Sequence, residues 1–309
     1  MDRVQAWLEV QMSIQMGIMF PPAIDISPTP PESPIDPEPR AQRWATIIFV
    51  LTATPILSGE PGARQPAEQN SFCEEDYALT FYVAEFINSL TNLAYVHLAL
   101  RYMYGPGSGG LLAPRLDFMS VSLLVLGIGS FLFHASLRQT LEFADEFSML
   151  GLTWAMLQAT LTTGQSPTKS RLISASLAMC FASFAVFYLQ SPSIIYQVIA
   201  FVSCLFVLIL RAQYLLYWLQ PALPEAKTRD WNKKTWRAVF ICLLGYVLWN
   251  IDLEYCATLR NIRQQLGLPW AWLFELHGWW HVLTAIGAAE CMNVAREVRE
   301  EVKRGQKRE

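Results

Sequence analysis

The residues best placed to do chemistry are two histidines near the C-terminal end of the chain, His277 and His281. Side chains four residues apart lie on one face of an α-helix, about one turn apart, which is how a helix supplies two ligands to one metal ion. The stretch around them, residues 270–292, is mostly apolar and long enough to cross a bilayer. Polar side chains there are costly and usually functional. The alternative is that neighbouring helices satisfy both histidines by hydrogen bonds.

A third ligand must come from the two other histidines of the chain. His134 lies at the end of another apolar segment, residues 117–137, and Ser130 precedes it by one helical turn. His97 lies in the middle of a further apolar segment, residues 79–101, and we interpret it as a packing or hydrogen-bonding residue. Asp145 lies in the first turns of the segment at 145–163. The candidate site therefore depends on how these segments are arranged.

The composition indicates a helical membrane protein. The chain has 309 residues, of which 53% are hydrophobic and only 16% are charged, against about 25% charged in an average soluble domain. From Tyr77 onward we expect an all-α fold with seven transmembrane helices, because seven apolar segments follow one another, each about as long as the hydrocarbon core requires. They span approximately residues 79–101, 117–137, 145–163, 172–190, 194–216, 237–257 and 270–292.

The rest of the chain is divided accordingly. Residues 1–70 are expected to form a Pro-rich, largely disordered extension, with a short apolar, signal-like stretch at 44–57. Residues 71–293 form the seven-helix domain, and residues 294–309 form a charged tail. Loops after the first, third and fifth segments, together with this tail, carry most of the lysines and arginines. The positive-inside rule therefore predicts a cytosolic C-terminus and a lumenal or exterior start of the first segment.

This topology predicts a catalytic layer near the non-cytosolic face of the membrane. Alternating directions bring His134, His277, His281, Ser130 and Asp145 to the same side of the bilayer. Three neutral imidazoles leave one position of a zinc ion open to water, which is typical of a catalytic site. Ser130 would donate to a developing oxyanion, and Asp145 would move the proton between the water and the leaving nitrogen. Alternatively, Ser130 is an ordinary small residue of helix packing.

A polar, mainly acidic cluster precedes the first segment and enters it. It contains Glu74, Glu75 and Asp76, followed by Glu85 and Asn88. Closely spaced oxygen ligands suit Ca²⁺. The alternative is a solvated flank of the membrane segment, or a favourable helix N-terminus.

Several short motifs resemble those of the alkaline ceramidase family, within the wider superfamily of seven-helix intramembrane hydrolases that includes adiponectin-receptor-like proteins. These motifs cover residues 72–292 in order: Cys73–Tyr77, Ala84–Asn88, Gly129–His134, Asp145–Glu146, Trp249–Asp252, Cys256, Leu259–Asn261 and Leu276–His281. The resemblance implies an integral membrane amidase of the endoplasmic reticulum or Golgi, with its active site towards the lumenal leaflet. Its substrate would be a ceramide-type lipid of the bilayer, cleaved to a sphingoid base and a free fatty acid.

The resemblance also implies roles for individual residues. The zinc ligands would be His134, His277 and His281, and the catalytic residues would be Ser130 and Asp145. The family's calcium site falls on Glu74, Asp76 and Glu85, with a backbone carbonyl from Phe72. The chain departs from the family where Ser71 replaces a common Asp and Asp76 replaces a common Asn. A disulfide between Cys73 and Cys256 is implied in the same way.

Other functions remain open from the sequence. A related hydrolase could act on ester-linked or glycosylphosphatidylinositol lipids with the same site. A seven-helix receptor with a structural zinc, or a membrane scaffold with satisfied polar residues, would need no open coordination position. No nucleic-acid partner is expected, because no basic face interleaved with stacking aromatic residues lies outside the apolar segments.

Overall fold

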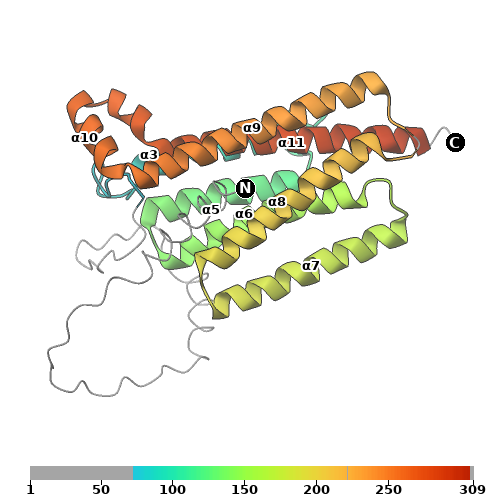
Figure 1. The fold of residues 1–309 in the computed structure, drawn as a ribbon, viewed down its shortest axis with the longest axis horizontal. Helices are drawn as coiled ribbons and strands as arrows, with labels where there is room; N and C mark the ends of the chain where they lie inside the picture. The colour runs from blue at the N-terminus through green and yellow to red at the C-terminus, as the bar shows by residue number, and fades with distance from the viewer. Residues whose placement is uncertain (1–71, 221, 307–309) are drawn as a thin grey trace, which may run out of the picture. The chain divides into compact units, whose positions relative to one another are not determined.

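The structure is a computed structural model that describes residues 72–220 and 222–306. The chain divides into two units, residues 1–56 and residues 57–309, and the first unit lies outside the described residues. The predicted extension, residues 1–70, and its signal-like stretch at 44–57 therefore lie outside them too. Every regular element of the described residues is helical, which confirms the all-α class (Figure 1).

The first predicted segment is shorter than expected and is interrupted. The helix begins only at α3 (Phe86–Thr91), and after a break at Asn92 it continues as α4 (Leu93–Met103). The prediction of a helix from residue 79 is wrong because the backbone before α3 has other partners. The N–H groups of Ala84 and Glu85 donate to the carbonyls of Ala135 and His134, at 2.9 and 3.0 Å. These bonds tie the start of α3 to the end of the second predicted segment, residues 117–137.

The middle of the chain forms four long helices close to their predicted places. They are α5 (Phe118–Ser136), α6 (Gln139–Thr162), α7 (Pro167–Gln190) and α8 (Ile194–Tyr217). Local capping explains two of the starts. Asp117 and Ser120 form a capping box at α5, and Ser166 accepts from the backbone of Lys169 at α7, where Pro167 occupies the first helical position.

The C-terminal helices extend beyond the predicted apolar segments. They are α9 (Glu225–Glu254), α10 (Cys256–Leu266), the 3₁₀ helix η1 (Trp270–Phe274) and α11 (Leu276–Gln306). Residues 294–306, which we expected to form a charged tail, continue α11. Val294 and Val298 are buried there in a cluster with Leu215, Leu216 and Trp231. Hydrophobic packing against α8 and α9 therefore extends the helix past its most apolar part.

Two pairs of helices approach closely through glycine. A Cβ at Gly287 would meet the sulfur of Cys242 and lie 3.0 Å from the carbonyl oxygen of Ala238, so α11 can lie against α9 only because this position lacks a side chain. A Cβ at Gly127 would lie 2.9 Å from side-chain atoms of Tyr95 and Val96 on α4. Such small-residue contacts are usual between membrane helices. Figure 1 shows α9 and α11 running side by side.

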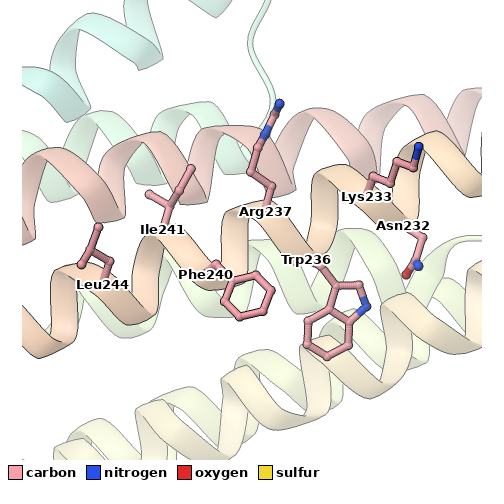
Figure 2. Close-up of a pocket in the computed structure, with 7 residues that line it drawn as sticks. All are labelled: Asn232, Lys233, Trp236, Arg237, Phe240, Ile241 and Leu244. Atoms are coloured by element: carbon pink, nitrogen blue, oxygen red, sulfur yellow. The ribbon is translucent and has the colours of Figure 1, made fainter.

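Four helices are long and apolar enough to cross a membrane by length and composition: α5, α7, α8 and α9. Their outward faces carry exposed large apolar side chains, as Trp236, Phe240 and Leu244 illustrate on α9 (Figure 2). Exposed apolar side chains of this kind are expected where lipid covers a protein. The helices α6 and α11 are as long but less apolar, because they carry charged and histidine side chains.

Candidate metal centre

Three histidines form the centre of the candidate site. His134 comes from the last turns of α5, and His277 and His281 come from the first turns of α11. Each offers a ring nitrogen such that the three atoms lie within 4.8 Å of one another, and all three side chains are buried. Within residues 72–220 and 222–306, this is the only group of three or more histidine, cysteine or acidic side chains with such spacing. The structure therefore brings together the three histidines that were predicted to share a site.

A buried carboxylate orients the first of these histidines. The Nδ1 atom of His134 lies 2.6 Å from Oε2 of Glu85, which also accepts from the amide of Asn88 at 2.9 Å. Both Glu85 and His134 are almost fully buried. A carboxylate beside Nδ1 favours the tautomer that carries its proton on that atom, which leaves Nε2 free as a ligand.

The hydroxyl group of Thr91 orients the ring of His281 in the same way. Thr91 Oγ1 lies 3.1 Å from Nδ1 of His281 and 2.9 and 3.0 Å from the carbonyl oxygens of Ile87 and Asn88. Because the carbonyls can only accept, the hydroxyl proton is directed at them, and Oγ1 is left to accept from Nδ1–H. His281 therefore also presents Nε2 as a free lone pair.

His277 differs from the other two histidines because neither of its ring nitrogens has a hydrogen-bond partner among the described residues. Its ring lies between aromatic side chains, with ring centroids 4.2 Å from Phe72 and 6.0 Å from Trp249. A buried imidazole without any partner is expensive, since its polar atoms lose water and gain nothing in exchange. A bound metal ion would remove that cost.

The two predicted catalytic residues lie together on neighbouring helices. Ser130 lies one turn before His134 on α5, and its side chain lies near the carboxylate of Asp145 on α6. Ser130 is buried, and Oδ1 of Asp145 is buried without a partner among the described residues. This oxygen of Asp145 is therefore available for a hydrogen bond to a ligand.

A loop before α3 is fastened beside the histidines. The backbone N–H of Cys73 donates to Asp252 at 3.3 Å, and the other oxygen of Asp252 accepts from the N–H of Leu276 at 3.1 Å.

A disulfide and an arginine also hold this loop. Cys73 and Cys256 are joined by their sulfur atoms, with Cα atoms 5.2 Å apart. Arg263 donates to the carbonyl of Cys73 at 2.7 Å and forms a buried ion pair with Glu275. Together these contacts hold Phe72 against the rings of His134 and His277.

The acidic cluster has a visible role in helix initiation. The two carboxylate oxygens of Glu74 accept from the N–H groups of Ile87 and Asn88, at 2.7 and 2.8 Å, in the first turn of α3. Burial raises the pKa of Glu74 to about 7, although these two bonds act in the opposite direction. Glu74, Asp76 and Glu85 do not form a group with metal-ligand spacing in the described part of the chain. Ser71 lies outside that part.

The remaining histidine does not join the site. His97 is exposed on α4, so the packing role expected for it is wrong. His97 lies on the outward side of the helix.

Three supporting features were not predicted from the sequence. Thr91 and Tyr95 lie on α3 and α4, where Tyr95 bonds Thr284 at 2.5 Å and its ring centroid lies 6.5 Å from that of His281. The third feature is the Arg263–Glu275 pair. A sequence signal existed for Tyr95, which follows Thr91 by one turn and so shares its helical face. No spacing rule links Arg263 to Glu275, because a turn and a 3₁₀ helix separate them.

Comparison with known proteins adds an independent finding. The model of the Ceramidase family matches residues 65–309. Alkaline ceramidase 3 of Mus musculus is 28% identical over 223 residues, which are 70% of this chain and 78% of that protein. Alkaline ceramidase YPC1 of Saccharomyces cerevisiae is 28% identical over 229 residues, 70% of this chain and 72% of that protein. An alkaline ceramidase of Arabidopsis thaliana is 24% identical over 219 residues, covering 70% and 78%.

Proposed function

This chain belongs to the ceramidase family, and we propose that it is a zinc-dependent intramembrane amidase that hydrolyses the amide bond of ceramides to a sphingoid base and a free fatty acid. The observation that carries the zinc assignment is the buried group of His134, His277 and His281. The curated relatives that it resembles are alkaline ceramidases by name. Membership of the family supports ceramide as the substrate class, and the histidine group supports hydrolysis assisted by a metal ion.

The donor set fits a zinc ion. Two of the histidines have their Nδ1 atoms engaged by Glu85 and Thr91, which leaves Nε2 of each free, and His277 has no competing partner. Nitrogen ligands from neutral imidazoles suit zinc, and three of them leave a fourth position for water or substrate. When bound there, the ion would lower the pKa of a water molecule to about 7 and polarise the amide carbonyl.

The protein's own residues would then move the protons and stabilise charge. We assign Asp145 as the group that takes the proton from the attacking water and delivers it to the nitrogen of the leaving sphingoid base. Ser130 would donate its hydroxyl hydrogen to the oxygen of the scissile carbonyl as negative charge develops there. The two side chains lie close together on neighbouring helices, so both could act on the same amide group. The aromatic walls of Phe72 and Trp249 would limit access of bulk water.

The membrane setting suits a lipid substrate. The apolar outward faces of α5, α7, α8 and α9 support an integral membrane protein. We propose a seven-helix topology in which α3 with α4 counts as one span, α6 and α11 also cross, and α10 lies outside the count. The lysine and arginine distribution supports a cytosolic C-terminus, with the histidine site towards the lumenal leaflet of the endoplasmic reticulum or Golgi. A ceramide would enter this site laterally from the bilayer.

A calcium site beside the first helix is a second, separate part of the proposal. Glu74, Asp76 and Glu85, with the carbonyl of Phe72 and with Ser71, would provide its ligands. A nearby cation is supported by Glu85, whose Oε1 is buried without a hydrogen-bond partner among the described residues. The Cys73–Cys256 bridge would hold this loop against α10. Removal of calcium with a chelator selective over zinc should lower the thermal midpoint, and no change would exclude the calcium site.

A substrate panel tests the function. Purified protein in detergent micelles would be given a labelled ceramide, a labelled diacylglycerol and a labelled glycosylphosphatidylinositol, and fatty acid release would be measured over a range of pH. The proposal predicts release from ceramide that is lost in Ser130→Ala and Asp145→Asn. Release from an ester lipid alone would replace the ceramidase assignment with a lipid esterase. Stoichiometric zinc without cleavage of any of these lipids would favour the receptor interpretation.

A further inference from the structure

A small cavity lies at the opposite end of the helices that carry the candidate site. Its volume is about 170 Å³. It is lined by the start of α5 (Asp117, Phe118), by Gln158 on α6, and by the last turns of α11 (Arg296, Arg299, Glu300, Lys303). The helices α5, α6 and α11 are the same three that carry His134, Ser130, Asp145, His277 and His281. The cavity therefore joins the far ends of the helices that form the histidine centre.

One arginine of the cavity, Arg296, is held in place by several contacts. Arg296 forms two bonds with the carboxylate of Asp117, at 2.7 and 3.1 Å, and another with Asn293 at 3.0 Å. Its guanidinium lies 3.5 Å from the ring centroid of Tyr102. The charges of Arg296 and Asp117 cancel each other, and the pair contributes rigidity rather than net charge.

The two other cations of the cavity, Arg299 and Lys303, are not paired with the acidic residues that also line it. No hydrogen bond or ion pair is made by the side chains of Arg299 or Lys303 within the described residues. The acidic residue between them in the sequence, Glu300, is paired with Arg304 instead. Arg299 and Lys303 are four residues apart, so they share one helical face, where like charges destabilise a helix. The protein thus keeps two repelling cations beside a cavity.

We propose that this cavity binds a phosphate group. An anion between Arg299 and Lys303 would neutralise the pair and accept charge-assisted hydrogen bonds from both side chains. The size of the cavity limits the ligand, because pockets for drug-sized molecules typically measure about 300–1,000 Å³. The space therefore suits a phosphate monoester or inorganic phosphate and not a whole nucleotide or acyl chain. Two sources carry this chemistry, a lipid headgroup at the membrane surface and a soluble phosphate ion, and the experiment below distinguishes them.

Phosphate bound in this cavity would stabilise the folded protein. Anything that binds only the folded protein stabilises it in proportion to the logarithm of its concentration over its dissociation constant. The first readout is therefore stability, and it does not depend on the proposed ceramidase activity. A failure of that activity would leave this site untouched, and a failure of the site would leave the activity untouched.

The test uses the thermal unfolding midpoint of the full chain in detergent micelles. One series adds potassium phosphate against potassium chloride at equal ionic strength. A second adds phosphatidic acid to the micelles against phosphatidylcholine. Wild type is compared with Arg299→Gln and Lys303→Gln, and with Lys233→Gln as the control. Lys233 also has no partner in the structure, but it lies on the outward face of α9 (Figure 2), outside this cavity.

We expect phosphate or phosphatidic acid to raise the midpoint of wild type and of Lys233→Gln. Each cavity substitution should weaken the apparent affinity roughly fivefold, yet without ligand these variants should be at least as stable as wild type, because a repulsion has been removed. A response to both additives indicates a soluble anion, and a response to phosphatidic acid alone indicates a headgroup. The proposal is overturned if neither additive raises the midpoint, if Arg299→Gln and Lys303→Gln respond as wild type does, or if Lys233→Gln loses the response equally.

Discussion

The two ends of the helical domain are built from polar residues in opposite ways. At the histidine end, Glu85, Thr91, Asp252 and Arg263 are enclosed by protein and make directed hydrogen bonds to the histidines or to the backbone beside them. At the basic end, the charged side chains of α9 and α11 form ion pairs at the surface, such as Lys227 with Glu301. A hydrophobic cluster around Trp231 holds the helices together there.

The two ends should therefore respond differently when a polar side chain is removed. Buried polar groups have no water to replace a lost partner, so their removal is costly and their geometry is strict. Exposed ion pairs exchange one partner for water and contribute little. We therefore expect large effects at the histidine end, both on chemistry and on stability, and small effects from single charges at the basic end.

The largest effect is expected from Asp145→Asn. An amide cannot take the proton from the attacking water, so ceramide hydrolysis should fall by about 10²–10⁴-fold, as for loss of general acid–base catalysis. The substitution keeps the shape of the side chain and leaves the three histidines untouched. Turnover and zinc content measured on the same preparation check this. A variant that lost its zinc as well would show that Asp145 acts in metal binding instead.

Arg263→Met should cause the next largest effect, on stability. The substitution leaves Glu275 buried and unpaired and removes a donor to the carbonyl of Cys73. Breaking a buried ion pair from one side costs about 3–5 kcal/mol. Thermal or denaturant unfolding in detergent measures the change. The double variant Arg263→Met with Glu275→Leu is the matched control, and it should recover much of the loss. Equal stability of the single and double variants would contradict a buried pair.

Thr91→Val should weaken metal binding without unfolding the protein. Valine keeps the branched shape but removes the acceptor of His281 Nδ1–H, whereas Thr91→Ser keeps it. Loss of such a supporting contact typically costs about 10–100-fold in metal affinity. Competition with a zinc chelator gives the affinity of each variant. If Thr91→Ser and Thr91→Val bind zinc with equal affinity, the hydrogen bond from His281 to Thr91 does not support metal binding. The strict geometry assigned to the histidine end would then be contradicted.

The smallest effect is expected at the basic end, from Lys227→Gln. Its ion pair with Glu301 has a nitrogen–oxygen distance of 2.8 Å, but the lysine is about half exposed. Exposed pairs contribute about 0.2–1 kcal/mol, and salt screens them. The unfolding midpoint should therefore change slightly, and less so at high salt. A loss as large as that of Arg263→Met would remove the distinction between the two ends.

The sequence predicted much of this arrangement. Apolar segment lengths gave the positions of α5 to α8 closely, because hydrophobic length is a strong local signal. The grouping of His134 with His277 and His281 also followed, because alternating helix directions fix which ends meet. Ser130 and Asp145 were placed beside each other for the same reason. They are neighbours in the structure.

The remaining features depend on contacts between distant parts of the chain. The late start of α3 results from backbone pairing with the end of α5, and the long course of α11 results from burial of Val294 and Val298. The role of Thr91 depends on the depth at which α11 passes α3, where a Cβ at Gly278 would lie 3.1 Å from the methyl group of Thr91. No periodicity in one segment carries that information.

The central claim is that His134, His277 and His281 hold a zinc ion required for amide hydrolysis. The most direct measurement compares wild type with His281→Ala, with zinc quantified and ceramide hydrolysis assayed on the same purified samples. The account predicts stoichiometric zinc and fatty acid release in wild type, and loss of both in the variant, with far-ultraviolet circular dichroism unchanged. Wild-type protein that hydrolyses ceramide without bound zinc, or a variant that keeps full activity, would contradict it.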